Sequence, residues 1–148
     1  MISAERYHDI SCGHRVYGHE SKCAHLHGHN YRVHFKVAGH AHEGNQEGLD
    51  HIGRVLDFSV IKTLLCQWLE DNWDHKFLVW EKDPWADVLY QLDRKGLVVT
   101  SFNPTAENMV DYLLNVVGPQ QLKNTDCMLM SVRVEETRKC SATSEIWV

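Results

Sequence analysis

The chain has 148 residues, of which 43% are hydrophobic and 24% charged, with nine glycines and three prolines. This composition is typical of an ordinary globular chain and excludes a disordered or collagen-like one. We therefore expect residues 1–148 to form a single domain with a core that needs no disulfides. The formal net charge of −5 argues against nucleic acid as a partner, because binding to phosphate backbones requires a basic surface.

The N-terminal residues, the short apolar runs and the cysteines predict a cytoplasmic protein. Residues 1–8 contain no apolar segment of the kind that directs export, and apolar runs such as residues 97–99 are too short to span a membrane. The five cysteines are odd in number and scattered along the chain. Such a distribution predicts free thiols in a reducing compartment, with no membrane association.

The first half of the chain predicts a hairpin followed by a helix. Residues 27–38 alternate between apolar and polar side chains, which is the period of a half-buried strand. Residues 39–48 are polar and rich in glycine and predict a loop, and residues 54–58 read as a returning strand. From Ser59, which is placed to cap the helix, apolar residues recur at helical spacing through Leu69.

The second half predicts a helix and then a strand. Residues 80–96 permit a short helix without requiring it. Residues 103–107 carry a cap, a proline and an acid, and they start an amphipathic helix that should stop at Gly118-Pro119. Residues 128–136 alternate again and predict a strand that ends at Glu136. With segments 2–12 and 145–148 added, we expect an α+β fold: a four-stranded antiparallel sheet with two helices on one face.

Histidine is concentrated near the N-terminus and indicates where the function lies. The chain has eleven histidines. His27 and His29 are separated by one glycine, so both imidazoles project from the same face of the strand, the face of Tyr31. With His14 as the most plausible third ligand they would make a three-histidine zinc site with an open position, the pattern of a catalytic zinc. The alternative is that these are core or surface histidines satisfied by protein partners.

Three other features are candidates for chemistry. Cys23 lies four residues before His27, and a thiol beside imidazoles and a dication would act as a base or nucleophile; its plain alternative is a small buried apolar residue. Asp74 and His75 form an adjacent acid and imidazole, which alone is weak evidence for catalysis. Glu136 falls on the apolar face of the predicted strand, where a buried carboxylate needs a hydrogen-bond donor or a cation as its partner. The alternative is that the strand ends at residue 135 and Glu136 is solvated.

These residues together resemble the 6-pyruvoyltetrahydropterin synthase superfamily across nearly the whole chain. The resemblance is carried by a few motifs: Cys23-x3-His27-Gly28-His29, His14 in residues 13–15, and the segments 56–58, 74–78, 103–108 and 134–137. The three residues between the cysteine and the H-G-H motif resemble the 6-carboxytetrahydropterin synthase branch, whereas the pyruvoyl-forming branch typically has five. The segment 80–102 is longer than compact members need.

The resemblance implies roles for individual residues. His14, His27 and His29 match zinc ligands, Cys23, Asp74 and His75 match the proton-transfer set, and Glu136 matches the residue that anchors the pterin. Thr105, at a helix start, is a further expected substrate contact. The resemblance also implies a tunnelling fold, in which sheets assemble into a barrel and two threefold rings stack as a dimer of trimers, a homohexamer with active sites between subunits.

The activity implied is that of a carbon–carbon lyase. It converts 7,8-dihydroneopterin triphosphate to 6-carboxy-5,6,7,8-tetrahydropterin, acetaldehyde and triphosphate, a step toward 7-deazaguanine and queuosine precursors. Two alternatives remain open from the residues: a pyruvoyl-forming synthase of the same family, against which the motif spacing argues, and a non-catalytic metal-binding protein that uses the histidine-rich segment.

Overall fold

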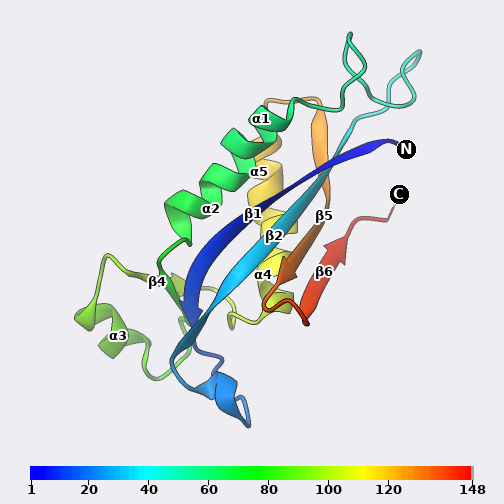
Figure 1. Cartoon of the computed structure of the whole chain (residues 1–148). Helices are drawn as coiled ribbons and strands as arrows, with labels where there is room; N and C mark the ends of the chain where they lie inside the picture. The colour runs from blue at the N-terminus through cyan, green and yellow to red at the C-terminus, as the bar shows by residue number, and fades with distance from the viewer. Residues whose placement is uncertain (148) are drawn as a thin grey trace.

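One sheet of six strands runs through the molecule in the order β4-β3-β1-β2-β5-β6 (Figure 1). The computed structural model describes residues 1–147. The strands are β1 (Ser3–His14), β2 (His27–Gly39), β3 (Phe77–Trp80), β4 (Leu97–Thr100), β5 (Cys127–Glu135) and β6 (Ser141–Glu145). β2 is antiparallel to β1 and β5, and β6 is antiparallel to β5, whereas β3 and β4 are parallel additions beside β1.

The expected four-stranded antiparallel sheet is therefore wrong in strand number and in direction, although the α+β class is confirmed. The two unforeseen strands, β3 and β4, have four residues each. The expected terminal segment 145–148 is also wrong as a strand: β6 ends at Glu145, residues 146 and 147 are not in a strand, and residue 148 lies outside the described residues. Runs this short lack the alternation that identifies a half-buried strand, and they lie in a segment dense in tryptophan and aspartate. The helix α3 (Ala86–Leu92) connects them and is the short helix that this segment permits.

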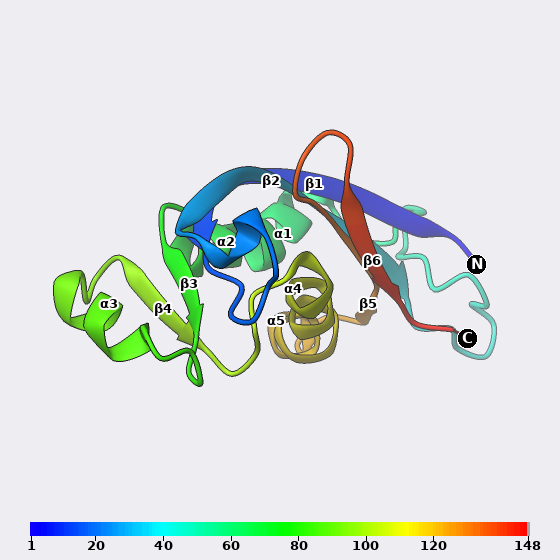
Figure 2. The same ribbon diagram turned by 90° about the horizontal axis from the view of Figure 1, so that it is seen from below.

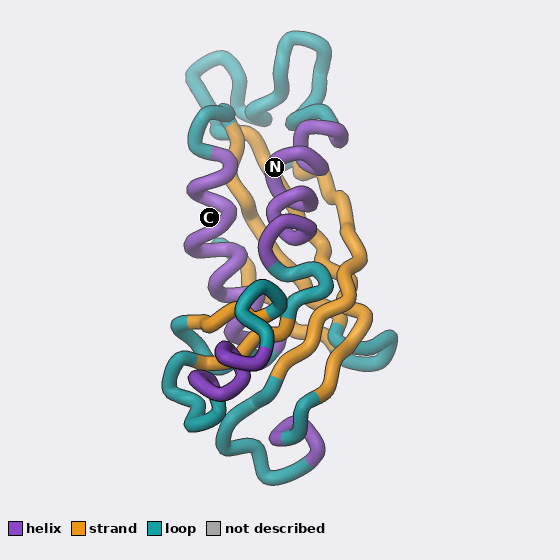
Figure 3. Tube along the Cα trace, turned by 90° about the vertical axis from the view of Figure 1, so that its left-hand side faces the viewer, coloured by secondary structure: helices purple, strands orange, loops and turns teal. Residues whose placement is uncertain are grey.

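Two long helices cover one face of the sheet, as predicted (Figures 2 and 3). The first consists of α1 (Phe58–Ile61), a π-helical turn (Lys62–Cys66) and α2 (Gln67–Asn72) in direct succession. The second consists of α4 (Ala106–Tyr112), a π-helical turn (Leu113–Val117) and α5 (Gly118–Leu122). Among residues 1–147, no helix has the length and apolar character needed to cross a membrane.

The first helix is capped by a different residue from the one expected. Asp57, not Ser59, is the cap: its carboxylate accepts hydrogen bonds from the amide and the hydroxyl of Ser59, each at 2.8 Å. The returning strand predicted over residues 54–58 does not form, so the long-looped hairpin is also wrong. Asp50 accepts bonds from the amides of Ile52 and Arg54, and these side chain to backbone bonds hold the segment as a turn.

The second helix continues beyond its expected end. Gly118 and Pro119 lie inside it rather than after it. Pro119 lacks an amide hydrogen and its ring crowds the preceding turn, but the wider π-helical turn just before it accommodates both effects. Gly118 is needed there because a Cβ would lie 2.6 Å from the Leu129 side chain of β5.

A β-bulge changes which side chains of β5 face the helices. The pairing of β5 with β2 shifts register between Lys36 and Val37. The core therefore receives Val132 and Val134 on one side of the bulge and Cys127 and Leu129 on the other. The expected single face from Met128 to Glu136 is thus wrong in its first half, because one extra residue reverses the side-chain alternation. The strand also ends at Glu135, one residue before its expected end at Glu136.

The core lies between the sheet and the two long helices. Its fully buried members include Phe35 of β2 and Leu65, Leu69 and Leu113 of the helices. Burial of each such side chain contributes roughly 1.5–3 kcal/mol. Tyr31 belongs to the same cluster and lies on β2 two residues beyond His29, so the packed core ends where the histidines begin.

Candidate metal centre and active site

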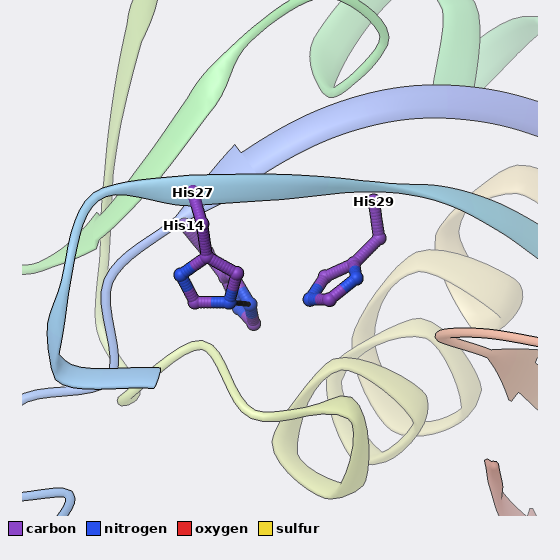
Figure 4. A group of neighbouring side chains, drawn as sticks. All are labelled: His14, His27 and His29. Atoms are coloured by element: carbon purple, nitrogen blue, oxygen red, sulfur yellow. Dashed lines mark hydrogen bonds between the residues drawn. The ribbon is translucent and has the colours of Figure 1, made fainter. Parts of the chain in front are cut away.

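The first strand pair brings three histidines together. His14 is the last residue of β1 and pairs directly with His27, the first residue of β2, while His29 pairs with Cys12. All three imidazoles lie on the helix-facing side of the sheet (Figure 4). One nitrogen from each ring lies within 4.8 Å of the others. The structure therefore brings together the three residues that the sequence predicts as metal ligands.

Gly28, between His27 and His29, is required for a steric reason. At Gly28 a Cβ would lie 3.0 Å from the Cys12 carbonyl oxygen and 3.3 Å from the Gly13 Cα. The two strands therefore approach each other closely next to the His14 and His27 pair. A side chain at position 28 would push β2 away from β1 and separate the two imidazoles.

Backbone carbonyls orient two of the rings. His14 Nδ1 lies 2.6 Å from the Pro104 carbonyl, and His27 Nδ1 lies 2.7 Å from the His25 carbonyl. A carbonyl oxygen can only accept, so each Nδ1 carries its hydrogen and each Nε2 offers a lone pair. Ligating histidines are commonly oriented in this way by a partner at the other ring nitrogen.

The resulting lone pairs fit a metal ion. The Nε2 atoms of His14 and His27 lie 3.0 Å apart with a lone pair each, an arrangement that is repulsive unless a cation or proton lies between them. His29 Nε2 is buried and makes no hydrogen bond to any of residues 1–147. A site with three neutral imidazoles suits Zn²⁺ and leaves a position open for substrate.

Burial favours the neutral form of two of the imidazoles, His14 and His29. It lowers the pKa of His14 to about 4, against the opposing hydrogen bond to Pro104, and His27 and His29 lower the pKa further. Burial also lowers the pKa of His29, although the Glu136 carboxylate acts in the opposite direction. At neutral pH the His14 ring is therefore unprotonated, the form in which histidine binds metals.

Tyr31 also belongs to the site, although the sequence pattern indicates only that it lies on the buried face of the strand. Its hydroxyl lies 3.3 Å from His14 Nδ1 and 3.4 Å from Nε2, and its side chain is fully buried. Burial, followed by the charge of Glu136, strongly raises the pKa of the phenol. Its parity with His27 and His29 on one strand is the sequence signal that could have indicated this position.

Cys23 lies in a short 3₁₀ turn (Lys22–Ala24) between β1 and β2. Its thiol is half-buried, and burial, followed by the charges of Glu136 and Glu20, raises its pKa. The protein groups alone thus favour a thiol rather than the reactive thiolate that the sequence suggests. The Val16 amide, two residues beyond His14, donates to the Cys23 carbonyl at 2.9 Å, so this turn lies beside the end of β1.

Asp74 and His75 lie beside Ser11, near the C-terminal end of β1. Asp74 accepts a bond from the Ser11 amide at 2.9 Å and lies 2.7 Å from His75 Nδ1, which orients the exposed imidazole. Burial acts to raise the pKa of Asp74, but the bonds from Ser11 and His75 outweigh it and lower the pKa. His75 has a φ of 58°, a left-handed conformation that costs about 1–2 kcal/mol for such a residue.

Glu136 connects the two parts of the site. Its carboxylate lies 3.3 Å from His29 Nε2. A cleft of about 700 Å³ is lined by both residues and by Asp74, His75 and Arg138. Cys23 is the exception to this convergence, because no hydrogen bond within residues 1–147 joins it to Asp74 or His75.

Thr105 caps α4 and accepts a hydrogen bond from the Asn108 amide at 3.1 Å. The helix therefore begins one residue after Thr105, and Pro104 precedes the cap instead of following it. The Pro104 carbonyl is the group that orients His14. The start of α4 thus lies at the histidine cluster, and its contact there is a backbone oxygen that sequence patterns do not reveal.

Comparison with known proteins gives consistent results. The profile of the 6-pyruvoyl tetrahydropterin synthase family matches residues 3–146. A 6-carboxy-5,6,7,8-tetrahydropterin synthase from Rickettsia typhi is 31% identical over 143 residues, which cover 95% of this chain and 97% of the relative. Another relative, from Haemophilus influenzae and with the same name, is 26% identical over 142 residues, 93% of this chain and 94% of the relative.

Solved structures share the fold. An uncharacterized protein from Wolinella succinogenes superposes with a TM-score of 0.79 at 20% identity and covers 97% of both chains. The 6-pyruvoyl tetrahydropterin synthase of Caenorhabditis elegans gives a TM-score of 0.62 at 23% identity, with 99% of this chain and 96% of that chain covered. With a family profile that matches almost every residue, the expected relationship is confirmed: this chain belongs to the 6-pyruvoyl tetrahydropterin synthase family.

Proposed function

We propose that this chain is a zinc-dependent 6-carboxytetrahydropterin synthase, a carbon–carbon lyase. It would convert 7,8-dihydroneopterin triphosphate to 6-carboxy-5,6,7,8-tetrahydropterin, acetaldehyde and triphosphate. The observation that carries the proposal is the convergence of His14, His27 and His29 within 4.8 Å, with Glu136 beside them. The name of the Rickettsia typhi relative and its coverage of 95% of the chain support the carboxy-forming branch.

His14, His27 and His29 would hold the zinc ion through Nε2. A bound Zn²⁺ supplies Lewis acidity toward the oxygen atoms of the substrate side chain. The Pro104 and His25 carbonyls keep the His14 and His27 rings in the ligating tautomer. Tyr31 closes the buried side of the site against water.

Cys23 and the Asp74–His75 pair would transfer protons. Asp74 holds His75 Nδ1 at 2.7 Å, so the Nε2 of His75 is the atom that would accept or donate a proton in the cleft. Cys23 would act from the other side, close to the zinc ligands. Its thiol would need the positive charge of the bound metal to become a thiolate, since burial, followed by the carboxylates of Glu136 and Glu20, raises its pKa.

Glu136 would anchor the substrate ring. A carboxylate can accept two parallel hydrogen bonds from the aminopyrimidinone edge of a pterin. Its position 3.3 Å from His29 would bring the ring next to the metal. Thr105 would contact the substrate at the start of α4.

Assembly would complete the site. Cys23 and His75 are not bonded to each other within one chain, and the edge strands β4 and β6 present backbone groups that can pair with a neighbouring copy. We propose a homohexamer, a dimer of trimers with active sites between subunits. We place it in the cytoplasm, in 7-deazaguanine and queuosine precursor synthesis, in keeping with the absence of disulfides among its described residues.

Metal dependence tests the proposal. Protein stripped by a chelator should form no acetaldehyde from 7,8-dihydroneopterin triphosphate, and one equivalent of Zn²⁺ per chain should restore it. His29→Ala should stay inactive after zinc addition, while His42→Ala, an exposed histidine paired with Asp126, should behave as the unaltered chain. Zinc binding without turnover in assembled protein would instead support a metal-binding protein without catalysis.

A further inference from the structure

Arg15 directly follows a metal ligand and is itself almost buried, with 10% of its side chain exposed. Its guanidinium makes three different contacts. It forms an ion pair with Asp83, its Nε donates to the Ala24 carbonyl at 3.0 Å, and its central carbon lies 3.6 Å from the centre of the Trp85 ring. A planar group with several fixed donors is suited to holding such partners at the same time.

The partner carboxylate belongs to the segment between β3 and α3. Asp83 is completely buried, and its Oδ1 also accepts a bond from the Trp85 amide at 2.8 Å. Its Oδ2 is buried without a hydrogen bond to any of residues 1–147. An isolated carboxylate in such a place is costly, so Asp83 depends on Arg15 for its charge balance. This segment is part of the stretch that is longer than the family resemblance requires.

Arg15 also binds the turn Lys22–Ala24, which carries Cys23. Two bonds connect this turn to the residues that follow His14: the Arg15 side chain binds the Ala24 carbonyl, and the Val16 amide donates to the Cys23 carbonyl at 2.9 Å. The turn has only three residues and none of them is buried. Packing alone therefore cannot hold it in place.

We propose that Arg15, clamped between Asp83 and Trp85, is a positioning residue that holds the Cys23 turn beside the histidine cluster. The segment between β3 and α3 thus serves the active site indirectly, as a support for the turn. The inference extends the proposed function, because it explains how the Cys23 thiol is kept in place. Arg15 itself takes no part in the chemistry.

The accessibility of the Cys23 thiol measures the clamp without any turnover. Iodoacetamide labelling, resolved by mass spectrometry of peptides, can be followed at each cysteine in the zinc-loaded, assembled protein. Cys140 is exposed and serves as the reference, whereas Cys12, Cys66 and Cys127 are buried and report general loosening. Release of the turn exposes the Cys23 thiol and removes the burial that raises its pKa, so both effects accelerate labelling.

Two conservative variants separate the clamp from general stability. Arg15→Lys keeps the positive charge but replaces the two separate donor nitrogens that bind Ala24 and Asp83 with a single one. Asp83→Asn keeps the shape but removes the negative charge. In each variant, iodoacetamide should label Cys23 about tenfold faster relative to Cys140. Tenfold is the change in the opening equilibrium of the turn that is expected when one hydrogen bond to a charged group is lost. Asp50→Asn, which alters an exposed ion pair with Arg54, is the matched control and should not change the ratio.

Two results would overturn the inference. One is an unchanged Cys23 rate in both variants. The other is a rise that Cys12, Cys66 and Cys127 share, because that pattern means general unfolding and not release of one turn. If the enzyme is active, the variants should also lower kcat about tenfold with KM unchanged; a preparation that makes no product would count against the proposed function while the labelling ratio still decides the clamp.

Discussion

His14 Nε2 and His27 Nε2 lie 3.0 Å apart although the other nitrogen of each ring already faces a backbone carbonyl. Two lone pairs at this distance repel each other, so the folded chain stores an unfavourable contact that a cation would convert into a favourable one. The strand pairing of His14 with His27 enforces the contact. Metal binding should therefore stabilise the fold as well as enable catalysis.

Zinc should raise the melting temperature of the unaltered protein and have little effect on His29→Ala. Free zinc at a hundredfold excess over its dissociation constant adds about 2.7 kcal/mol to the free energy of unfolding. Differential scanning calorimetry with and without zinc, combined with metal analysis of the dialysed protein, measures both effects. An equal zinc response in His29→Ala would show that the metal binds elsewhere.

Cys23→Ala should keep its zinc and lose turnover. A positioned acid or base contributes typically 10²–10⁴-fold to a rate, so product formation should fall by about a hundredfold or more. Cys140→Ala, at an exposed cysteine, provides the matched control. Full activity in Cys23→Ala would remove the cysteine from the mechanism while leaving the metal site intact.

Glu136→Gln should weaken substrate binding without changing the zinc content. The amide preserves the shape but cannot accept two hydrogen bonds from the pterin edge, and a hydrogen bond to a charged group contributes about 1.5–3 kcal/mol. KM should therefore rise about tenfold or more. Glu135→Gln changes the neighbouring carboxylate, which lies 2.6 Å from His34 instead, and should leave KM unaltered.

Asp74 should stabilise the protein at neutral pH but not in acid. The bonds from Ser11 and His75 lower its pKa in the folded state, below the unfolded value of about 3.9. Its contribution is therefore present above that value and is lost as pH falls through the lowered pKa. Asp74→Asn should unfold about 1 kcal/mol more easily at pH 7.

Urea unfolding of both proteins, in the presence of a chelator so that metal release plays no part, checks this pH dependence. The difference between the two free energies of unfolding should shrink as the pH is lowered from 5 toward 2. A difference that stays constant across that range would mean that the carboxylate charge of Asp74 does not stabilise the fold.

The sequence predicts best the elements whose apolar and polar residues alternate regularly because one side is buried and the other is exposed. The alternation over residues 27–38 identifies β2, because one face packs on helices and the other does not. The parity of His27 and His29 then places both rings on one face. His14 joins these two histidines because β1 extends to residue 14 and pairs there with His27 of β2.

Elsewhere, tertiary contacts decide features that local patterns do not contain. The bulge opposite Lys36 and Val37 reverses which side chains of β5 point toward the helices. It arises from the pairing with β2, and no sequence signal near Met128 indicates it. β3 and β4 gain their strand structure from parallel neighbours distant in sequence. The Arg15 and Asp83 contact joins residues far apart along the chain, and neither neighbourhood predicts the other.

The identity of the product decides whether this chain is a 6-carboxytetrahydropterin synthase. Zinc-loaded protein should be incubated with 7,8-dihydroneopterin triphosphate, the pterin product identified by mass spectrometry and acetaldehyde assayed in parallel. We expect 6-carboxy-5,6,7,8-tetrahydropterin and an equal amount of acetaldehyde. A pyruvoyl-substituted tetrahydropterin formed without acetaldehyde would contradict it and would assign the same fold and site to the other branch of the family.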